Sequence, residues 1–132
     1  MSDAVFVMDA SVLVDVLLVP SRGEQLSELV GTGVVTAPAH IDAEVASALS
    51  RLYRNGDLSA DQVTTRLSSV ETMTMQRHPV ASLLAKAWLL RENVFILDAL
   101  YLVLAQNLNT DVLTTDARLS RANQRARLVL WT

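Results

Sequence analysis

The chain has 132 residues, of which 51% are hydrophobic and 19% are charged, and its formal net charge is −3. This length and composition predict one folded domain over residues 1–132 and exclude an intrinsically disordered chain. Because the chain has no cysteine, a disulfide framework, a thiolate nucleophile and a zinc–cysteine site are excluded. No uncharged apolar run approaches the roughly 20 residues of a membrane-spanning helix, so we expect a cytoplasmic protein with no membrane contact.

The first half of the chain alternates short apolar runs with longer segments whose apolar residues follow a helical period. In chain order, the expected elements are a strand at Val5–Met8, helices over Ala10–Leu18 and Glu24–Val30 separated by a break at Pro20–Gly23, a strand at Val34–Thr36 stopped by Pro38, and a helix over Ile41–Tyr53. Asn55 and Gly56 are typical of the end of that last helix.

The second half of the chain continues this alternation. Ser59 and Gln62 have the spacing of a capping box, which predicts a helix over Ala60–Val70. The elements expected after it are a weak strand at Thr72–Gln76, helices over Val80–Arg91 and from Asp98 to Asn107, and short strands at Val112–Thr114 and Leu128–Trp131 with a helical or turn segment between them. Strands that alternate with helices predict an α/β fold with a mainly parallel sheet covered by helices.

Several acidic residues stand beside or within apolar segments. Asp9 follows the first strand, Asp116 follows the strand at Val112–Thr114, and Asp98 interrupts an apolar run. Binding sites of parallel sheets form outside the carboxyl ends of the strands, where Asp9 and Asp116 would lie, while Glu44 and Asp98 are expected near helix N-termini. Carboxylates gathered there would repel one another, and Mg²⁺ or Mn²⁺, which prefer hard oxygen ligands, would relieve that repulsion.

Each of these acids also has a simpler, purely structural interpretation. Asp9, Asp98 and Asp116 all fit the N-cap of a helix, and Glu44 fits an ordinary glutamate of a first helical turn. Ser11 and Thr114 would either support a metal ligand or cap the local backbone. Two further acids are expected to have structural roles: Asp42 as the cap of the helix beginning at Ile41, and Asp15 as a solvent-facing residue. We expect His40 and His78 to be non-catalytic, and Tyr101 and Trp88 to be packing residues.

Ten of the eleven basic side chains are arginine, the residue best suited to bidentate contacts with phosphate. Four of them lie in a segment that has no acid after Asp116, namely Arg118, Arg121, Arg125 and Arg127. Arg118 and Arg121 are candidate RNA contacts. A solvated helix face or a dimer contact explains the same arginines equally well.

Four acid-containing pieces, Val7–Leu13, Ala43–Val45, Asp98–Tyr101 and Leu113–Leu119, follow one another along the chain. In order, spacing and total length, the chain resembles the PIN-domain family and, within it, the VapC-type ribonuclease toxins of bacterial toxin–antitoxin pairs. The resemblance implies a three-layer α/β/α sandwich around a short parallel sheet. It also implies a catalytic and metal-binding site of Asp9, Glu44, Asp98 and Asp116, with Ser11 and Thr114 as polar supports.

This resemblance implies Mg²⁺- or Mn²⁺-dependent cleavage of a structured RNA, such as tRNA or rRNA, by the toxin of a type II toxin–antitoxin system. It further implies a homodimer and a small VapB-type antitoxin, for which the candidate apolar faces are Val45, Leu49 and Leu52, and Val63, Leu67 and Val70, unless these residues are core.

Three other functions are compatible with the residues. The first is a PIN-like domain that binds RNA or a protein without cutting. The second is a domain with an aspartate nucleophile, but such sites need a second acid close by and a late lysine, whereas Ser11 follows Asp9 and the only lysine is Lys86. The third is a purely structural interaction protein, which the high apolar content favours.

Overall fold

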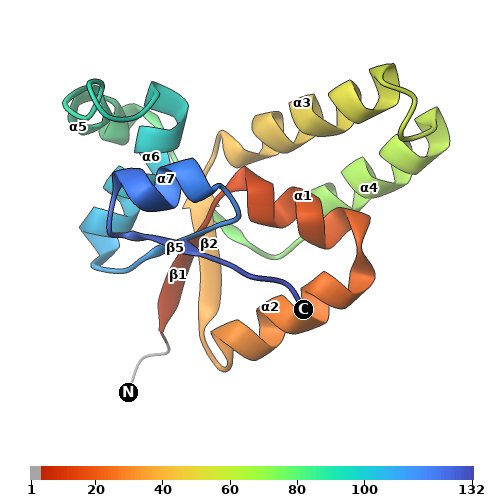
Figure 1. Ribbon diagram of the computed structural model, residues 1–132, viewed down its shortest axis with the longest axis horizontal. Helices are drawn as coiled ribbons and strands as arrows, with labels where there is room; N and C mark the ends of the chain where they lie inside the picture. Colours follow the sequence, from red (N-terminus) through yellow and green to blue (C-terminus); the bar gives the residue numbers. More distant parts are fainter. Residues whose placement is uncertain (1–3) are drawn as a thin grey trace.

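Five strands form one sheet in the computed structural model, which describes residues 4–132 (Figure 1). The strands are β1 (Val5–Met8), β2 (Val34–Pro38), β3 (Gln76–His78), β4 (Val112–Thr114) and β5 (Ala126–Leu128). Their order is β3-β2-β1-β4-β5 and every pairing is parallel. Val7 of the central strand pairs with both Thr36 and Val112 and is fully buried, as expected of a strand covered on both faces.

Helices cover both faces of this sheet, so the predicted three-layer α/β/α sandwich is confirmed. They are α1 (Ala10–Leu18), α2 (Pro20–Val30), α3 (Ile41–Arg54), α4 (Ala60–Thr72), the 3₁₀ helix η1 (Ala81–Leu83), α5 (Leu84–Trp88), α6 (Ile96–Leu108) and α7 (Ala117–Ala122). In Figure 1, α1 to α4 lie on one side of the strands, and α5 and α6 lie on the other. Within the described residues, no helix has the length and apolar character needed to cross a bilayer.

Several predicted elements match the structure closely. The bounds of β1, α1 and β4 are those expected, and the capping box between Ser59 and Gln62 is formed by both of its hydrogen bonds. The predicted break at Pro20–Gly23 is wrong, because α2 begins at Pro20. Proline suits the first position of a helix, since the N–H that it lacks would have no helical partner there.

The predicted single helix over Val80–Arg91 is also wrong. The segment forms η1 and α5, and beyond Trp88 it continues as tight turns in which Leu89, Leu90 and Arg91 donate to carbonyl oxygens three residues earlier. Trp88 does not pack in the core as expected: it is exposed, and the Arg91 guanidinium lies 4.6 Å from its ring centroid. The composition of this segment did not indicate that the α-helix ends at Trp88 and that the chain then turns toward α6.

The two edge strands are displaced from their predicted positions. The third strand is Gln76–His78 and not Thr72–Gln76, because α4 extends to Thr72 and pairing with β2 begins at Gln76. The last strand is Ala126–Leu128 and not Leu128–Trp131, because β4 pairs with the earlier residues.

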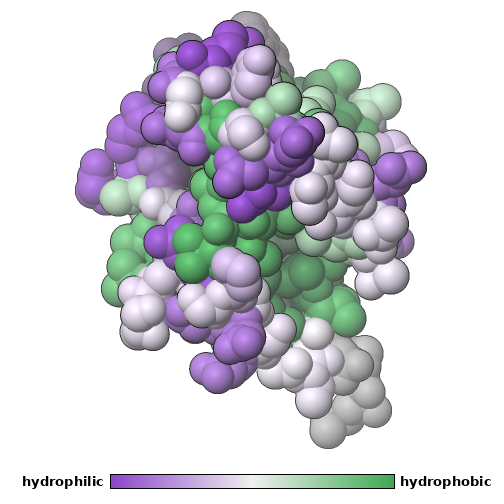
Figure 2. Space-filling view, turned by 90° about the vertical axis from the view of Figure 1, so that its right-hand side faces the viewer, coloured by the Kyte–Doolittle hydropathy of each residue, from purple (hydrophilic) through white to green (hydrophobic). Residues whose placement is uncertain are grey.

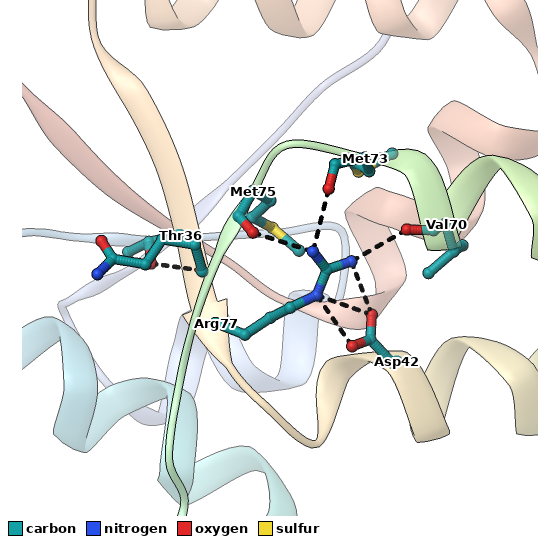
Figure 3. Close-up of polar contacts among 7 residues, drawn as sticks. Thr36, Asp42, Val70, Met73, Met75 and Arg77 are labelled. Atoms are coloured by element: carbon teal, nitrogen blue, oxygen red, sulfur yellow. Dashed lines mark hydrogen bonds and ion pairs between the residues drawn. The ribbon is translucent and has the colours of Figure 1, made fainter.

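Arg77 joins β3 to two helices through one guanidinium group (Figure 3). Its Nε and Nη2 donate to the Asp42 carboxylate at 2.9 and 3.0 Å. Its Nη1 and Nη2 also donate to the carbonyl oxygens of Val70, Met73 and Met75 at 2.9–3.2 Å. Asp42 is therefore an ion-pair partner and not the expected helix cap, and the pair holds the first turn of α3 against the end of α4.

Replacing Arg77 with methionine should lower the free energy of unfolding by about 1–2 kcal/mol. Asp42 and three carbonyl oxygens would lose their donor, but both partners are partly exposed, so water would replace some of the lost bonds. Urea denaturation measures the change. Arg54→Met is the matched control, because exposed Arg54 donates to Ser50 across one helical turn of α3. Equal effects of the two substitutions would contradict the role given to Arg77.

Candidate active site

A cavity of about 410 Å³ opens where the carboxyl ends of β1 and β4 meet the first turns of α3 and α6. All four predicted acids line it, namely Asp9, Glu44, Asp98 and Asp116. Asp9 directly follows β1, Asp116 caps α7, and Glu44 and Asp98 lie in first helical turns. Side chains that are up to 107 positions apart in the sequence are thus brought to one place by the parallel sheet.

Asp9 is the most deeply buried of these acids, with 6% of its surface exposed. It is the N-cap of α1, as one of its two interpretations predicted: its Oδ1 accepts from the Val12 N–H at 3.3 Å and from the Ser11 hydroxyl at 2.5 Å. Burial raises the pKa of Asp9 to about 6, against the lowering effect of the Ser11 and Thr114 hydroxyls. Nearby Asp98 raises the pKa of Asp9 further.

Ser11 and Thr114 connect the ends of the two central strands. The Ser11 hydroxyl accepts from the Thr115 N–H at 2.9 Å while it donates to Asp9. The Thr114 hydroxyl accepts from the Asp116 N–H at 3.0 Å and lies 3.4 Å from the Ser11 oxygen. Ser11 therefore satisfies a backbone group and also orients Asp9, whereas Thr114 satisfies the Asp116 N–H and lies against Ser11.

Asp116 and Asp98 differ in their helical positions. Asp116 is an N-cap, and its Oδ1 accepts from the Arg118 N–H at 2.9 Å. The predicted capping role of Asp98 is wrong, because α6 begins at Ile96 and Phe95 is its N-cap. Asp98 is consequently free to face the cavity. Its pKa is raised by partial burial and then by the negative charges of Glu44 and Asp116.

Glu44 is held by two residues that the sequence placed outside the site. The Tyr101 hydroxyl donates to Glu44 Oε1 at 2.7 Å, and His40 Nε2 lies 3.2 Å from the same oxygen. His40 Nε2 also lies 2.9 Å from the carbonyl oxygen of Leu97. Since both of its neighbours are acceptors, Nε2 carries the hydrogen. Burial alone would raise the pKa of Glu44, but the hydrogen bonds from His40 and Tyr101 lower it overall.

The spacing of His40 and Tyr101 from the predicted acids could have indicated that both lie at the site. His40 precedes Glu44 by four residues and Tyr101 follows Asp98 by three, spacings that place side chains on one helical face. Tyr101 is buried, as expected of a packing residue, yet its hydroxyl reaches the cavity. Burial and the adjacent Glu44 raise the pKa of Tyr101, so the hydroxyl keeps its proton and remains a donor.

The remaining predicted residues occupy different surroundings. Asp15 was expected to face solvent, but its Oδ2 accepts from the Trp131 indole N–H at 2.8 Å and the residue lines the cavity. Arg118 is 3.6 Å from Asp116 and borders a neighbouring cavity. Arg121 lies on the exposed surface of α7 and lines neither of these two cavities.

The cavity offers ligands of the kind that a divalent cation prefers, but their side chains are not yet arranged around one ion. Within residues 4–132, no three acidic or histidine side chains are already placed to hold one ion together. The donors on the cavity wall are nonetheless the hard carboxylate oxygens that Mg²⁺ and Mn²⁺ prefer. Burial is the largest cause that raises the pKa of both Asp9 and Asp98, and for Asp98 the positive charges of Arg118 and His40 offset only part of that rise. The residues therefore fit a cation if their side chains close around it.

Comparisons with known proteins agree on one family. The sequence model of the PIN domain matches residues 6–124. Ribonuclease VapC3 of Mycobacterium tuberculosis is 42% identical over 117 residues, which cover 88% of this chain and 85% of that protein. Ribonuclease VapC1 of the same organism is 35% identical over 122 residues, covering 88% of this chain and 89% of that protein.

Two solved structures share the fold at low sequence identity. One contains VapBC2 from Rickettsia felis bound to a DNA fragment from their promoter; it aligns with a TM-score of 0.70 and 13% identity over 98% of this chain and all of that chain. The other is Mycobacterium tuberculosis VapC20, described as a Sarcin-Ricin loop cleaving toxin, with a TM-score of 0.64 and 19% identity over 91% of this chain and 95% of that chain.

Proposed function

Because the chain belongs to the PIN-domain family and, within it, to the VapC ribonucleases, we propose that it is a Mg²⁺- or Mn²⁺-dependent endoribonuclease and the toxin of a type II toxin–antitoxin pair. The observation that carries this proposal is the meeting of Asp9, Glu44, Asp98 and Asp116 in one cavity. The relatives named as ribonucleases support RNA as the substrate.

In this proposal the four acids divide the work of metal-assisted hydrolysis. Asp9 and Asp98 are the principal metal ligands, Asp116 completes the set directly or through water, and Glu44 binds the metal or orients the attacking water. A bound cation would lower the pKa of that water and offset the negative charge that develops on the scissile phosphate. No side chain needs to act as a nucleophile, which suits a chain without cysteine.

The neighbouring residues keep these acids oriented. Ser11 holds Asp9 through its hydroxyl, and Thr114 holds the backbone of Asp116. Tyr101 and His40 hold one oxygen of Glu44, which leaves its other oxygen for the metal or the water.

Tyr101→Phe should reduce the cleavage rate by about tenfold, the lower end of the effects seen when a residue orients a metal ligand. The ring would keep its place in the core, but Glu44 would lose the donor at 2.7 Å. Single-turnover cleavage measured across a Mg²⁺ titration tests this. Tyr53→Phe, on the exposed side of α3, is the matched control. Wild-type rates at every Mg²⁺ concentration for Tyr101→Phe would refute the role.

The proposed substrate is a structured RNA such as tRNA or rRNA. The VapC20 structure, described as that of a Sarcin-Ricin loop cleaving toxin, supports this class. The direct experiment compares cleavage of total tRNA and rRNA by the purified protein with Mg²⁺, with Mn²⁺ and with chelator. Cleavage that needs either metal and stops with chelator supports the proposal, and metal-independent cleavage contradicts it.

We propose a small VapB-type antitoxin and a second copy of the chain as protein partners, acting in the cytoplasm. The Rickettsia felis VapBC2 structure supports the antitoxin. Figure 2 shows hydrophobic residues gathered on the side that carries α1 to α4. Of the candidate faces, Val45, Leu49 and Val70 are core and cannot bind a partner, which leaves Leu52, Val63 and Leu67, all at least partly exposed.

The alternative function is a PIN-like module that binds RNA or protein without cleaving. It would require that the acids not bind metal, so a calorimetric titration with Mg²⁺ and Mn²⁺ distinguishes the two functions. The aspartate-nucleophile alternative is disfavoured by the position of Lys86, which lies on α5 and does not line the acid cavity.

A further inference from the structure

The segment that follows β5, residues 129–132, runs past the end of β4 to the helices α1 and α2 (Figure 1). The Val129 N–H donates to the carbonyl oxygen of Thr114 at 2.7 Å. The Thr132 N–H donates to Gln25 Oε1 at 2.8 Å, and Gln25 Nε2 donates back to the Thr132 carbonyl oxygen at 3.3 Å. The segment is therefore attached to β4 at one end and to α2 at the other.

Trp131 lies between these two attachments and contacts α1. Its indole N–H donates to Asp15 Oδ2 at 2.8 Å, and the Arg22 guanidinium lies 5.9 Å from its ring centroid. Arg22 is also 3.7 Å from Asp15 Oδ1. The indole has one polar atom, and that atom is directed at Asp15. The direction of the Asp15 carboxylate is consequently set by a residue that is distant in the sequence.

Asp15 extends the acid cavity along α1. It lines the same cavity as Asp9, six residues earlier, and 27% of its side chain is exposed. Six residues of an α-helix rise by about 9 Å, a separation that a cation with its bound waters spans more readily than a bare ion. Mg²⁺ keeps several of its waters when it binds protein carboxylates, and those waters donate hydrogen bonds to acceptors around the site.

Negative charge on the lining of this cavity is in excess. Within residues 4–132, five carboxylates line it against one guanidinium, that of Arg51. Arg22 balances part of the Asp15 charge, but the Trp131 indole is neutral and leaves other lone pairs of the carboxylate free. The charge of Asp15 therefore adds to the attraction that the cavity exerts on a cation, and its free lone pairs can accept from the waters of that cation.

We propose that Asp15 is a fifth acid of the metal site, acting through the waters of the bound cation, and that Trp131 is the residue that positions it. This role rests on the proposed function as a metal-dependent ribonuclease. Without the indole N–H, the Asp15 carboxylate can rotate toward Arg22, which does not line the cavity. Trp131 thus influences metal binding although it does not line the cavity itself.

A purely structural attachment of residues 129–132 is the competing explanation. It predicts that loss of the Trp131 bond lowers stability and leaves the affinity for metal unchanged. The segment is already attached through Gln25 and through the carbonyl oxygen of Thr114, so its attachment does not require Asp15. The indole N–H, by contrast, bonds to a side chain that lines the acid cavity, which favours a positioning role.

Calorimetric titration of the RNA-free protein with Mg²⁺ tests this role apart from cleavage. Asp15→Asn removes the charge but keeps an oxygen for the indole N–H, and it should weaken Mg²⁺ binding by about tenfold, the lower end of the effect of residues around a metal site. Trp131→Phe keeps a ring but removes the N–H, and it should weaken binding by about three- to tenfold. Leu130→Ala, an exposed change in the same segment, is the matched control and should leave the affinity unchanged.

A double-mutant cycle separates positioning from a structural effect. If Trp131 acts through Asp15, adding Trp131→Phe to Asp15→Asn should change the Mg²⁺ affinity by less than about twofold. Urea denaturation in chelator records stability separately. Unchanged Mg²⁺ affinity in either single variant overturns the proposal, even where stability falls. An additive effect of Trp131→Phe on the Asp15→Asn protein also overturns it, because Trp131 would then act through the packing of α1.

Cleavage by the active protein distinguishes this proposal from the proposed function. Asp15→Asn and Trp131→Phe should each need more Mg²⁺ for half-maximal cleavage, with little change in the rate at saturating Mg²⁺. If the wild type binds neither Mg²⁺ nor Mn²⁺, the metal-dependent function is contradicted together with this role. If the wild type binds metal and cleaves RNA, and both variants bind Mg²⁺ as tightly, only the role of Asp15 and Trp131 is overturned.

Discussion

Asp98→Asn is expected to abolish RNA cleavage and to leave the protein folded. Asp98 lines both the acid cavity and the cavity beside it and is a proposed metal ligand. Asparagine keeps its size but removes the charge, so the rate should fall by at least about 10³-fold, as when one member of a catalytic set is lost. Single-turnover cleavage of a hairpin RNA, with Mg²⁺ binding measured by calorimetry, tests this expectation.

The fold should tolerate this substitution because Asp98 lies inside the first turn of α6, whose N-cap is Phe95. Partial burial and the charges of Glu44 and Asp116 already disfavour the ionised carboxyl, as its raised pKa indicates. The melting temperature should therefore be equal to or above that of the wild type. Glu71→Gln, an exposed change on α4, is the control for charge alone. Full cleavage activity in Asp98→Asn would overturn the assignment of the site.

The second large effect is expected on stability, from Asp9→Asn. Burial raises the pKa of Asp9 from 3.8 to about 6 in the folded protein. The folded state therefore binds this proton more tightly than the unfolded state does, and stability falls as the pH rises from about 4 to about 6. A shift of about two pKa units corresponds to about 3 kcal/mol. Without metal, the free energy of unfolding of the wild type should therefore be lower at neutral pH than below pH 4 by about this amount.

Asparagine does not ionise, and its side-chain oxygen can still accept from Ser11 and Val12. In chelator at pH 7, Asp9→Asn should therefore be more stable than the wild type by about 2–3 kcal/mol, with a flatter pH dependence between 4 and 6. Urea denaturation at several pH values measures both quantities, and Asp57→Asn in the exposed connection between α3 and α4 is the control.

Mg²⁺ provides the complementary measurement for Asp9. At pH 7 the cation should raise the unfolding free energy of the wild type, because it binds the folded state, and should have little effect on Asp9→Asn. An Asp9→Asn variant that is less stable than the wild type in chelator would contradict the burial argument. Equal stabilisation of both proteins by Mg²⁺ would contradict the role of Asp9 as a ligand.

The sequence predicted four of the acids that line the cavity, and two of them lie beside a local signal. Asp9 and Asp116 end apolar runs and begin helices, and both are N-caps in the structure. Short apolar runs also predicted β1 and β4 with their observed bounds. These features depend on residues within one or two turns of each other, so they could be predicted without knowledge of the fold.

Other features depend on partners that are distant in the sequence. Asp42 pairs with Arg77, which is 35 residues away, and Asp15 accepts a hydrogen bond from Trp131, 116 residues away. Neither acid has the local role that its neighbours suggested. The same holds for Glu44 and Tyr101, which are 57 positions apart and meet only because α3 and α6 both begin at the carboxyl edge of the sheet.

By itself, the sequence determined the parallel α/β architecture and the strand ends at which Asp9 and Asp116 lie, because hydrophobic period and capping act over a few residues. Only the tertiary structure decided which side chains hold those acids, where the edge strands pair, and that the loop before α6 forms a second cavity beside them. Those outcomes depend on packing between segments that are far apart in the chain, and such packing leaves no periodic signal in either segment.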